Sequence, residues 1–418
     1  MEYSNLIQQL FKTEYRKIIA VLCRLFGSRH IAVVEDIVST VFLEASEKWA
    51  SEGPPANPTS WLYAVARNKT IDYLRRNQIF LVNVSEHLRG QVTHCHEIDL
   101  NFSDENIVDS ELAMLFAICH PCNTKEARVG LALKLLCGFS VEQIANAFLT
   151  NKEVVYKRLQ RAKDKLRAKE IEIQSPTKQE ITDRMDSVLL ILYLLFSEGY
   201  FGSDRDIVIR RELCTEAMRL TFLMTNTSET NSPEVNALLS LMCFHASRFE
   251  ARIDQQGDRI LYDEQNTGLW DADLIDKGEY FLNMAARGDR VTKFHLEAAI
   301  AYWHTKREEP GCDKWQNVLM LYDQLLACNN SPMAALSRAF AVSKVHGKLR
   351  AIADAEKINM PHNYFYHCLL AELYNGVNIE KEVFHLRRAL VLTPLAGDRL
   401  MIDRKLQRAI TQQGQNLG

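Results

Sequence analysis

Apolar residues recur at spacings of three and four along most of the chain, which is the pattern of amphipathic helices. The clearest case is the segment 33–49, whose apolar positions form one stripe: Val34, Ile37, Val38, Val41, Phe42, Ala45 and Trp49. Runs that alternate between apolar and polar residues, as half-buried strands do, are scarce. The pattern therefore predicts an all-α fold.

Polar and charged positions divide this pattern into three helical blocks. Residues 1–85, 111–170 and 180–418 are helical by pattern, and the sequence QSPT at 174–177 precedes the third block. Between Arg89 and Lys125 there is no Lys or Arg, whereas six carboxylates occur there: Glu97, Asp99, Asp104, Glu105, Asp109 and Glu111. Such a composition is typical of a linker, which we place at residues 86–110.

The first block contains a second helix with a basic polar side. A Pro-rich loop at 53–58 precedes it, and Thr59 or Ser60 can cap a helix that opens at Trp61. One polar face then carries Asn68, Asp72, Arg75 and Arg76, with Arg67 beside it. Taken alone, this face is an ordinary solvated one in which Asp72 pairs with a neighbouring arginine.

The second block has the pattern of a helix-turn-helix. Ser140 with Gln143 and Thr150 with Glu153 are predicted capping boxes, which start helices at about 141–148 and 151–169. Gly138 can end a supporting helix over 131–137. The second of the paired helices turns four apolar residues inward: Val155, Leu159, Ala162 and Leu166.

This last helix is strongly basic, with eight Lys or Arg and three acids between residues 152 and 170. A fully solvated helix has a similar composition. Its position in a helix-turn-helix nevertheless favours recognition of the DNA major groove. The net charge of the whole chain, −3, does not by itself indicate a nucleic-acid binder.

Composition limits the remaining possibilities. The ten cysteines form no paired framework, which is typical of a reducing cytoplasm. The longest apolar run, 188–196, has about half of the roughly 20 residues that a bilayer requires, so we expect a buried helix and no membrane partner. The His and Cys residues at 94–96 and 119–122 would form a zinc site only if the two clusters converged, and we expect no metal and no cofactor. No Gly-rich phosphate loop, HExxH or nucleophile elbow occurs, so we do not expect an enzyme.

Two pairs of segments carry a family resemblance. Residues 35–43 (EDIVSTVFL) and 58–76 (PTSWLYAVARNKTIDYLRR) resemble region 2 of the extracytoplasmic-function sigma factors. Residues 138–145 (GFSVEQIA) and 155–163 (VYKRLQRAK) resemble region 4 of the same family. The resemblance implies an alternative sigma factor that binds core RNA polymerase through the β′ clamp helices and the β flap. Such a protein directs transcription initiation at promoter DNA.

The resemblance also implies a role for individual residues. Contacts to polymerase are implied for Glu35, Asp36, Ser39 and Leu43. Contacts to the −10 element fall to Trp61, Arg67, Asn68, Arg75 and Arg76. Contacts to the −35 element or its phosphates fall to Lys152, Tyr156, Lys157, Arg158, Arg161 and Lys163. The acidic linker either threads the polymerase cleft or is a disordered tether.

The third block is longer than a minimal sigma factor needs. Residues 364–394 have the layout of a tetratricopeptide repeat, with a turn at Gly376 and a closing Pro394. Residues 264–271 (EQNTGLWD) resemble a motif of the sigma subgroup with a tetratricopeptide-like extension. The residues that match closely are Gln265, Leu269, Trp270 and Asp271.

The resemblance implies that this extension regulates the sigma domains in cis or through a protein or ligand partner. The alternative is a structural appendage. For the chain as a whole, the alternatives are a helix-turn-helix regulator with a helical sensor domain and a tetratricopeptide scaffold.

Overall fold

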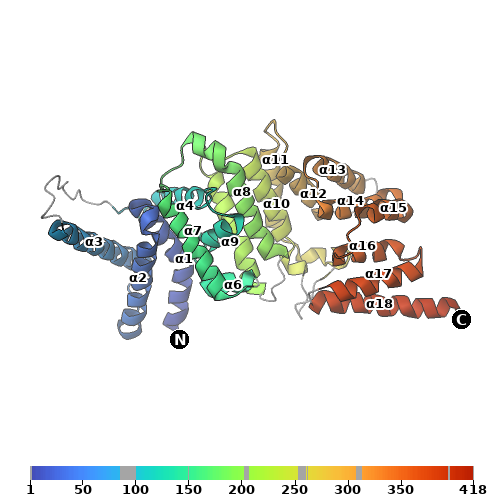
Figure 1. The fold of residues 1–418 in the computed structure, drawn as a ribbon, viewed down its shortest axis with the longest axis horizontal. Coiled ribbons are helices and arrows are strands. Elements are labelled where there is room, and N and C mark those ends of the chain that lie inside the picture. The colour runs from blue at the N-terminus through green and yellow to red at the C-terminus, as the bar shows by residue number, and fades with distance from the viewer. Residues whose placement is uncertain are drawn as a thin grey trace. The chain divides into compact units, whose positions relative to one another are not determined.

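The computed structural model describes residues 2–84, 100–148, 150–201, 207–252, 260, 262–306, 313–393 and 396–417. Within these ranges every regular element is a helix, which confirms the predicted all-α fold (Figure 1). The chain forms two compact units. The first comprises Met1–Asp204 and Thr215–Met224, and the second comprises Arg205–Cys214 and Thr225–Gly418. No helix among the described residues is long and apolar enough to cross a membrane.

The helices of the first unit contain both segments that resemble sigma regions. Their bounds are α1 Glu2–Phe26, α2 Ile31–Glu52, α3 Pro58–Val84, α4 Asp104–Ile118, α5 Lys125–Leu131, α6 Val141–Ala147, α7 Lys152–Ala168, α8 Lys178–Phe201 and α9 Ile207–Thr225. The last helix contributes residues 215–224 to this unit and residues 207–214 to the second. A short 3-10 helix, η1 (Ser28–His30), joins α1 to α2.

The two amphipathic patterns on which the prediction depended are confirmed. All seven apolar residues of the stripe in α2 are buried, as is Ile31 before them. In α7 the four residues predicted to face inward are also buried. Helix α6 buries Ile144 and Ala145, and the positive φ of Gly138 (72°) turns the chain before it, as predicted. The segment before Gly138 is a π-helix, η3 (Ala132–Leu136), that continues α5.

Two of the predicted helix caps were wrong by a few residues. The side chain of Asn57, rather than Thr59 or Ser60, accepts from the N–H of Ser60 at 3.0 Å, and α3 begins at Pro58. Proline suits this first position because it has no N–H to leave unpaired. Asn151 likewise replaces Thr150 as the cap of α7. Asn is at least as good a cap as Ser or Thr, and Asn57 and Asn151 lie two residues and one residue from Thr59 and Thr150.

The capping box of Ser140 with Gln143 is confirmed, with distances of 3.1 Å and 2.8 Å for its two hydrogen bonds.

The end of the predicted linker is helical. Ser103 caps α4, which begins at Asp104, so residues 104–110 belong to a helix. Asp104 and Glu105 lie in its first turn, where carboxylates stabilise the positive end of the helix dipole. The acidic composition of this part is therefore that of a helix N-terminus. Linker residues 86–99, with Glu97 and Asp99, lie outside the described residues.

A network of four alternating charges joins three helices of the first unit. Glu111 of α4 is buried, and both its oxygens accept from Arg219 of α9 at 3.0 and 3.1 Å. Glu216 accepts from Arg219 at 2.9 Å and from Arg16 of α1 at 2.6 Å. Arg219 also donates to the carbonyl of Leu136, at the end of η3, at 3.1 Å. Burial of charge is tolerated here because each group has opposite charges around it.

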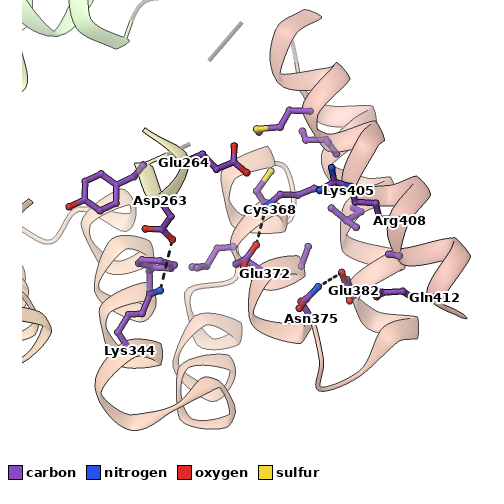
Figure 2. Close-up of a pocket in the computed structure, with 18 residues that line it drawn as sticks. Asp263, Glu264, Lys344, Cys368, Glu372, Asn375, Glu382, Lys405, Arg408 and Gln412 are labelled. Atoms are coloured by element: carbon purple, nitrogen blue, oxygen red, sulfur yellow. Dashed lines mark hydrogen bonds and ion pairs between the residues drawn. The ribbon is translucent and has the colours of Figure 1, made fainter. Parts of the chain in front are cut away.

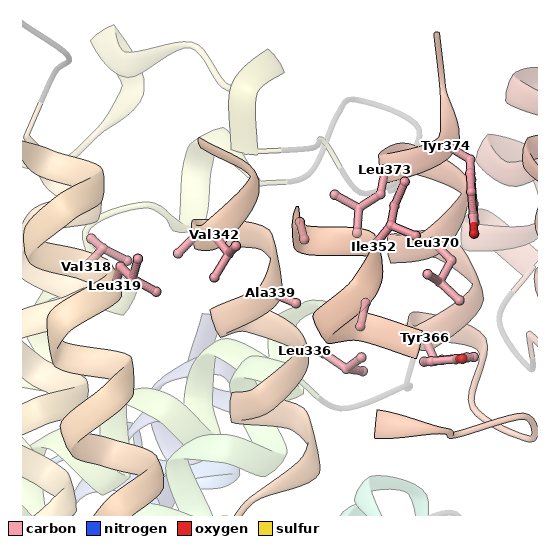
Figure 3. Packing of buried hydrophobic residues seen from close by; sticks show 13 residues of the cluster. Val318, Leu319, Leu336, Ala339, Val342, Ile352, Tyr366, Leu370, Leu373 and Tyr374 are labelled. Carbon is pink, nitrogen blue, oxygen red and sulfur yellow. The ribbon is translucent and has the colours of Figure 1, made fainter. Parts of the chain in front are cut away.

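The second unit is a series of helices in which α12 to α18 each pack on the next along the chain. Their bounds are α10 Pro233–Ala246, α11 Ala272–Ala285, α12 Lys293–Thr305, α13 Lys314–Cys328, α14 Pro332–His346, α15 Lys348–Ile358, α16 Tyr364–Tyr374, α17 Ile379–Leu392 and α18 Ala396–Leu417. Figure 3 shows one core cluster, in which residues of α13 to α16 such as Val318, Val342 and Leu370 meet.

Such serial packing of helical hairpins is what a repeat architecture requires. The predicted turn at Gly376 lies between α16 and α17 with φ at 73°, whereas Pro394 lies outside the described residues.

Replacement of Glu111 by Ala should destabilise the first unit by about 3 kcal/mol, because it leaves two arginines facing a single carboxylate in a buried site. Urea unfolding of the full chain, with hydrogen exchange of the peptides from α1 and α4, measures this loss. Asp109→Ala is the matched control, since Asp109 lies on the same helix but is exposed, 3.8 Å from Arg24. Equal effects of the two variants would show that the network does not stabilise the fold.

Candidate nucleic-acid and partner interfaces

The predicted basic face of α3 is exposed. Arg67, Asn68, Arg75 and Arg76 all lie at the surface, and Asp72 lies among them. Trp61 differs from these residues because it is half-buried. Its ring packs edge-on against Trp49 at 5.4 Å, and the ammonium of Lys48 lies 5.8 Å from it. Trp61 therefore fixes the start of α3 on α2 as well as forming part of the predicted surface.

The polymerase residues predicted on α2 separate into two groups. Asp36, Ser39 and Leu43 follow one another at helical spacing on one exposed face, and Leu43 is 58% exposed. An exposed leucine of this extent, beside polar neighbours, provides apolar contact area for a partner. Glu35 is half-buried and instead forms an ion pair with Lys163 of α7.

The predicted recognition helix α7 has an open half and a packed half. Lys152, Tyr156, Lys157 and Arg161 are exposed, Tyr156 by 63%, whereas Arg158 is partly buried. Lys152 reaches Glu142 of α6 at 2.7 Å. The exposed residues lie in the first three turns, where recognition helices contact base edges and phosphates.

The packed half of α7 lies against η1 and α2. Besides the pair of Lys163 with Glu35, the hydroxyl of Ser28 donates to the carbonyl of Leu166 at 3.4 Å, and Arg29 pairs with Glu170. Glu35 was predicted to contact polymerase and Lys163 to contact DNA. In the structure these two residues instead pair with each other. The spacing within either helix contains no sign of this pairing.

The residues of the extension motif are mainly structural in this arrangement. The side-chain oxygen of Gln265 accepts from Arg248 Nε at 3.1 Å, and the Arg248 guanidinium lies 5.5 Å from the ring of Trp270. Asp271 caps α11 by accepting from the N–H of Leu274 at 3.0 Å. Leu269 is the apolar residue of this set that is exposed, with 49% of its surface accessible, and Asp271 is exposed as well.

The motif is built around a group of residues that has no signature in the sequence. Tyr262 lies under Arg248, at 4.7 Å, and donates its hydroxyl proton to the carbonyl of His304 at 2.7 Å. Lys314, although buried, donates to the Tyr262 oxygen at 2.9 Å and to the carbonyl of Lys306 at 2.8 Å. These residues are far apart in the sequence and have no common spacing, so only the fold reveals them.

His304 belongs to the same group and lies partly buried between two aromatic rings, Tyr262 at 5.2 Å and Trp315 at 5.9 Å. Burial lowers the pKa of this imidazole to about 3, and the neighbouring Arg248 and Lys314 act in the same direction. The ring is therefore neutral in the folded protein at any physiological pH.

The Cys and His clusters divide between described and undescribed parts of the chain. Residues 94–96 lie outside the described ranges. Cys119 is buried at the end of α4, and the N–H of Cys122 donates to His120 Nδ1 at 3.2 Å. No group of three or more His, Cys, Asp or Glu side chains in the described part of the chain is arranged to hold a metal ion.

Helices α3 and α7 each expose a basic face, and comparison with known proteins narrows the class of protein. Residues 10–79 match the family Sigma-70 region 2, and residues 184–286 match a family of unknown function, DUF6596. No solved structure matches the chain.

Two relatives extend the comparison. The chain is 30% identical over 344 residues, 82% of its length and 81% of the relative, to "Uncharacterized protein R00370" of Rhizobium meliloti. It is 25% identical over 131 residues, 28% of its length and 68% of the relative, to a "Probable RNA polymerase sigma factor" of Haemophilus influenzae. The chain therefore belongs to one family with the rhizobial protein, and its residues 10–79 match a sigma-70 region 2 domain.

This domain implies a sigma-factor role in transcription initiation, for which core RNA polymerase and promoter DNA are the partners. The matches point to a transcription factor rather than to an enzyme. The region 2 match covers all of α2 and most of α3.

Acid should destabilise the second unit through His304. Because the pKa of the folded state lies below the ordinary 6.5, this contribution is complete above about pH 6.5 and is lost as the pH falls toward 3. His304→Phe keeps the aromatic contacts and cannot take up a proton. Its unfolding free energy should therefore fall less than that of the parent between pH 6.5 and 5, by about 2 kcal/mol.

Urea unfolding of both full-length proteins across this pH range, with hydrogen exchange of the α12 peptides, provides the test. His362→Phe, at an exposed position, should leave the acid dependence unchanged. An identical acid dependence in the parent and in His304→Phe would refute the assignment.

Proposed function

We propose that this protein is an alternative sigma factor of the extracytoplasmic-function type, which brings core RNA polymerase to a defined set of promoters. The observation that carries the proposal is the exposed face of Arg67, Asn68, Arg75 and Arg76 on α3, within the segment that matches region 2. Guanidinium groups neutralise phosphates, and the amide offers a donor and an acceptor to a base edge. We assign this face, with Trp61 at its start, to the −10 element.

For polymerase we propose the exposed face of α2, made by Asp36, Ser39 and Leu43, as the contact with the β′ clamp helices. An apolar side chain surrounded by polar ones is the usual composition of a small protein–protein contact. A second contact of the helix-turn-helix with the β flap follows from the resemblance to region 4.

For the −35 element we propose the open half of α7, with Lys152, Tyr156, Lys157 and Arg161 as its main contacts and Arg158 beside them. Three of the four main contacts are cationic, so they set the register on the phosphates, and Tyr156 adds an amphipathic ring. Lys163 has a different position because it is paired with Glu35. We propose that this pair holds α7 against α2 in the protein without polymerase and that it opens when the two residues take up their separate partners.

For the extension we propose regulation of the sigma domains, in cis or through a partner that binds the second unit. Gln265, Trp270 and Asp271 support this by holding the segment before α11 in one conformation, which leaves Leu269 exposed at its surface. A helix-turn-helix regulator that acts without polymerase remains the second candidate. The match to region 2 favours the sigma factor, since such a regulator has no need of that domain.

Transcription from purified components tests the proposal. The full chain, added to core RNA polymerase and promoter DNA selected for binding by the holoenzyme, should give initiation at one position. Leu43→Glu should weaken core binding about tenfold or more, because it places a charge in an apolar contact. Leu25→Glu is the matched control, since Leu25 is also exposed, by 42%, but lies on α1. A chain that binds duplex DNA equally well without core would be the regulator instead.

Recognition by α7 predicts a particular dependence on salt. Lys157→Ala and Arg161→Ala should each weaken promoter binding by the holoenzyme and reduce the slope of log K against log salt by about 1, because each removes one phosphate contact. Lys178→Ala removes an exposed cation at the start of α8 and should change neither quantity. Slopes that agree among all three variants would exclude the open half of α7 as the DNA-binding surface.

A further inference from the structure

The second unit contains a cavity of about 550 Å³ that the sigma-factor function does not use. Its walls come from α14, α16, α17 and α18, with the short helix η5 (Tyr262–Glu264) at the rim. This volume lies within the usual range of small-molecule sites. The lining combines an apolar surface with charged side chains, as Figure 2 shows.

Glu382 is the unusual member of this lining. Its residue surface is only 6% exposed, and Asn375 donates to one carboxylate oxygen at 3.0 Å. The other oxygen is buried and has no hydrogen-bond partner among the described residues. A buried carboxylate oxygen without a donor is costly, so a lone one that borders a cavity indicates a ligand that brings the donor.

The other charges of the cavity determine the sign of that ligand. Glu372 pairs with Lys405 at 3.0 Å, and Asp263 lies 4.0 Å from Lys344. These two pairs cancel. Among the described residues this leaves Glu382 and the rim residue Glu264 without cationic partners, against one cation, Arg408, that has no acidic partner. The unpaired charge is therefore negative.

The apolar lining determines the remainder of the ligand. Much of the cavity lining is formed by aliphatic and sulfur-containing side chains: Leu369, Leu386, Met401, Ile402 and Cys368. Methylene groups pack well on such a surface, and Lys and Arg side chains are the common example of an aliphatic stem with a charged end. Free diamines and guanidino-amines have the same chemistry.

We propose that this cavity binds an alkylammonium or alkylguanidinium group, with its charged end on Glu382 and its methylene stem along the apolar wall. The site is independent of the sigma-factor assignment, because it depends only on residues of the second unit. A ligand of this chemistry comes either from a free small molecule or from a basic side chain of a protein, and the probes below distinguish the two.

The test is calorimetric titration of the full chain. Agmatine and spermidine represent the free ligands. A capped pentapeptide with lysine between two pairs of glycines represents a protein side chain, and the same peptide with norleucine in place of lysine is its neutral control. At least one cationic probe should bind saturably with a dissociation constant below about 1 mM, a modest affinity for so small a group, and the norleucine peptide should not bind.

Two variants should change the affinity in opposite directions. Glu382→Gln keeps the shape and removes the charge, so it should weaken binding about tenfold or more. Arg408→Gln removes a repelling cation from the rim and should strengthen binding about twofold or more. Glu380→Gln is the matched control, because Glu380 is exposed on the same helical turn and does not line the cavity.

Glu382→Asp keeps the charge but shortens the side chain, and it should retain part of the affinity that Glu382→Gln loses. Loss of binding in both variants, together with a lower melting temperature, would show a structural role and overturn the proposal. The same conclusion follows if no cationic probe binds, or if the affinity in Glu382→Gln equals that of the parent.

Discussion

The first unit is organised around the alternation of charges among Arg16, Glu111, Glu216 and Arg219, in which Glu111 is buried and the other three are partly buried. The desolvation of Glu111 alone would not be repaid in an apolar interior, so it requires the arginines. Arg219 also donates to the carbonyl of Leu136, at the end of the π-helix before the helix-turn-helix. The same interaction that joins α1, α4 and α9 thus fixes the segment from which α6 and α7 follow.

Packing distinguishes one basic residue of α7 from the others. The eight Lys and Arg residues between 152 and 170 are equivalent in composition. Lys163 reaches Glu35, whereas Lys157 and Arg161 in the first three turns remain exposed, as do Lys165, Arg167 and Lys169 further along. Lys163 is therefore set apart from the open surface that we propose for DNA.

Much of the fold could be predicted from the sequence, because a helix with one buried face has apolar residues at regular spacing. The stripes of α2 and α7 and the capping box of Ser140 were read from spacing alone, since they depend on neighbours within one or two turns. The wrong caps at Thr59 or Ser60 and at Thr150 were errors of choice among nearby residues that can all cap a helix. Contacts between distant segments produce no such spacing pattern in the sequence. The pairing of Lys163 with Glu35, the group around Tyr262 and the cavity beside Glu382 are all of this kind.

The boundary of the extension depends on contacts between distant segments and not on local spacing. Sequence analysis placed it at residue 180, whereas Ser187 of α8 accepts from Arg128 of α5 at 3.0 Å and residues 215–224 belong to the first unit. A chain cut at 180 would lose Glu216 and Arg219, and its failure would report lost folding rather than lost regulation. The DUF6596 match, residues 184–286, likewise begins in the first unit and ends in the second. Regulation by the extension is therefore best separated from folding by single substitutions within the second unit, or by removal of residues that follow α9.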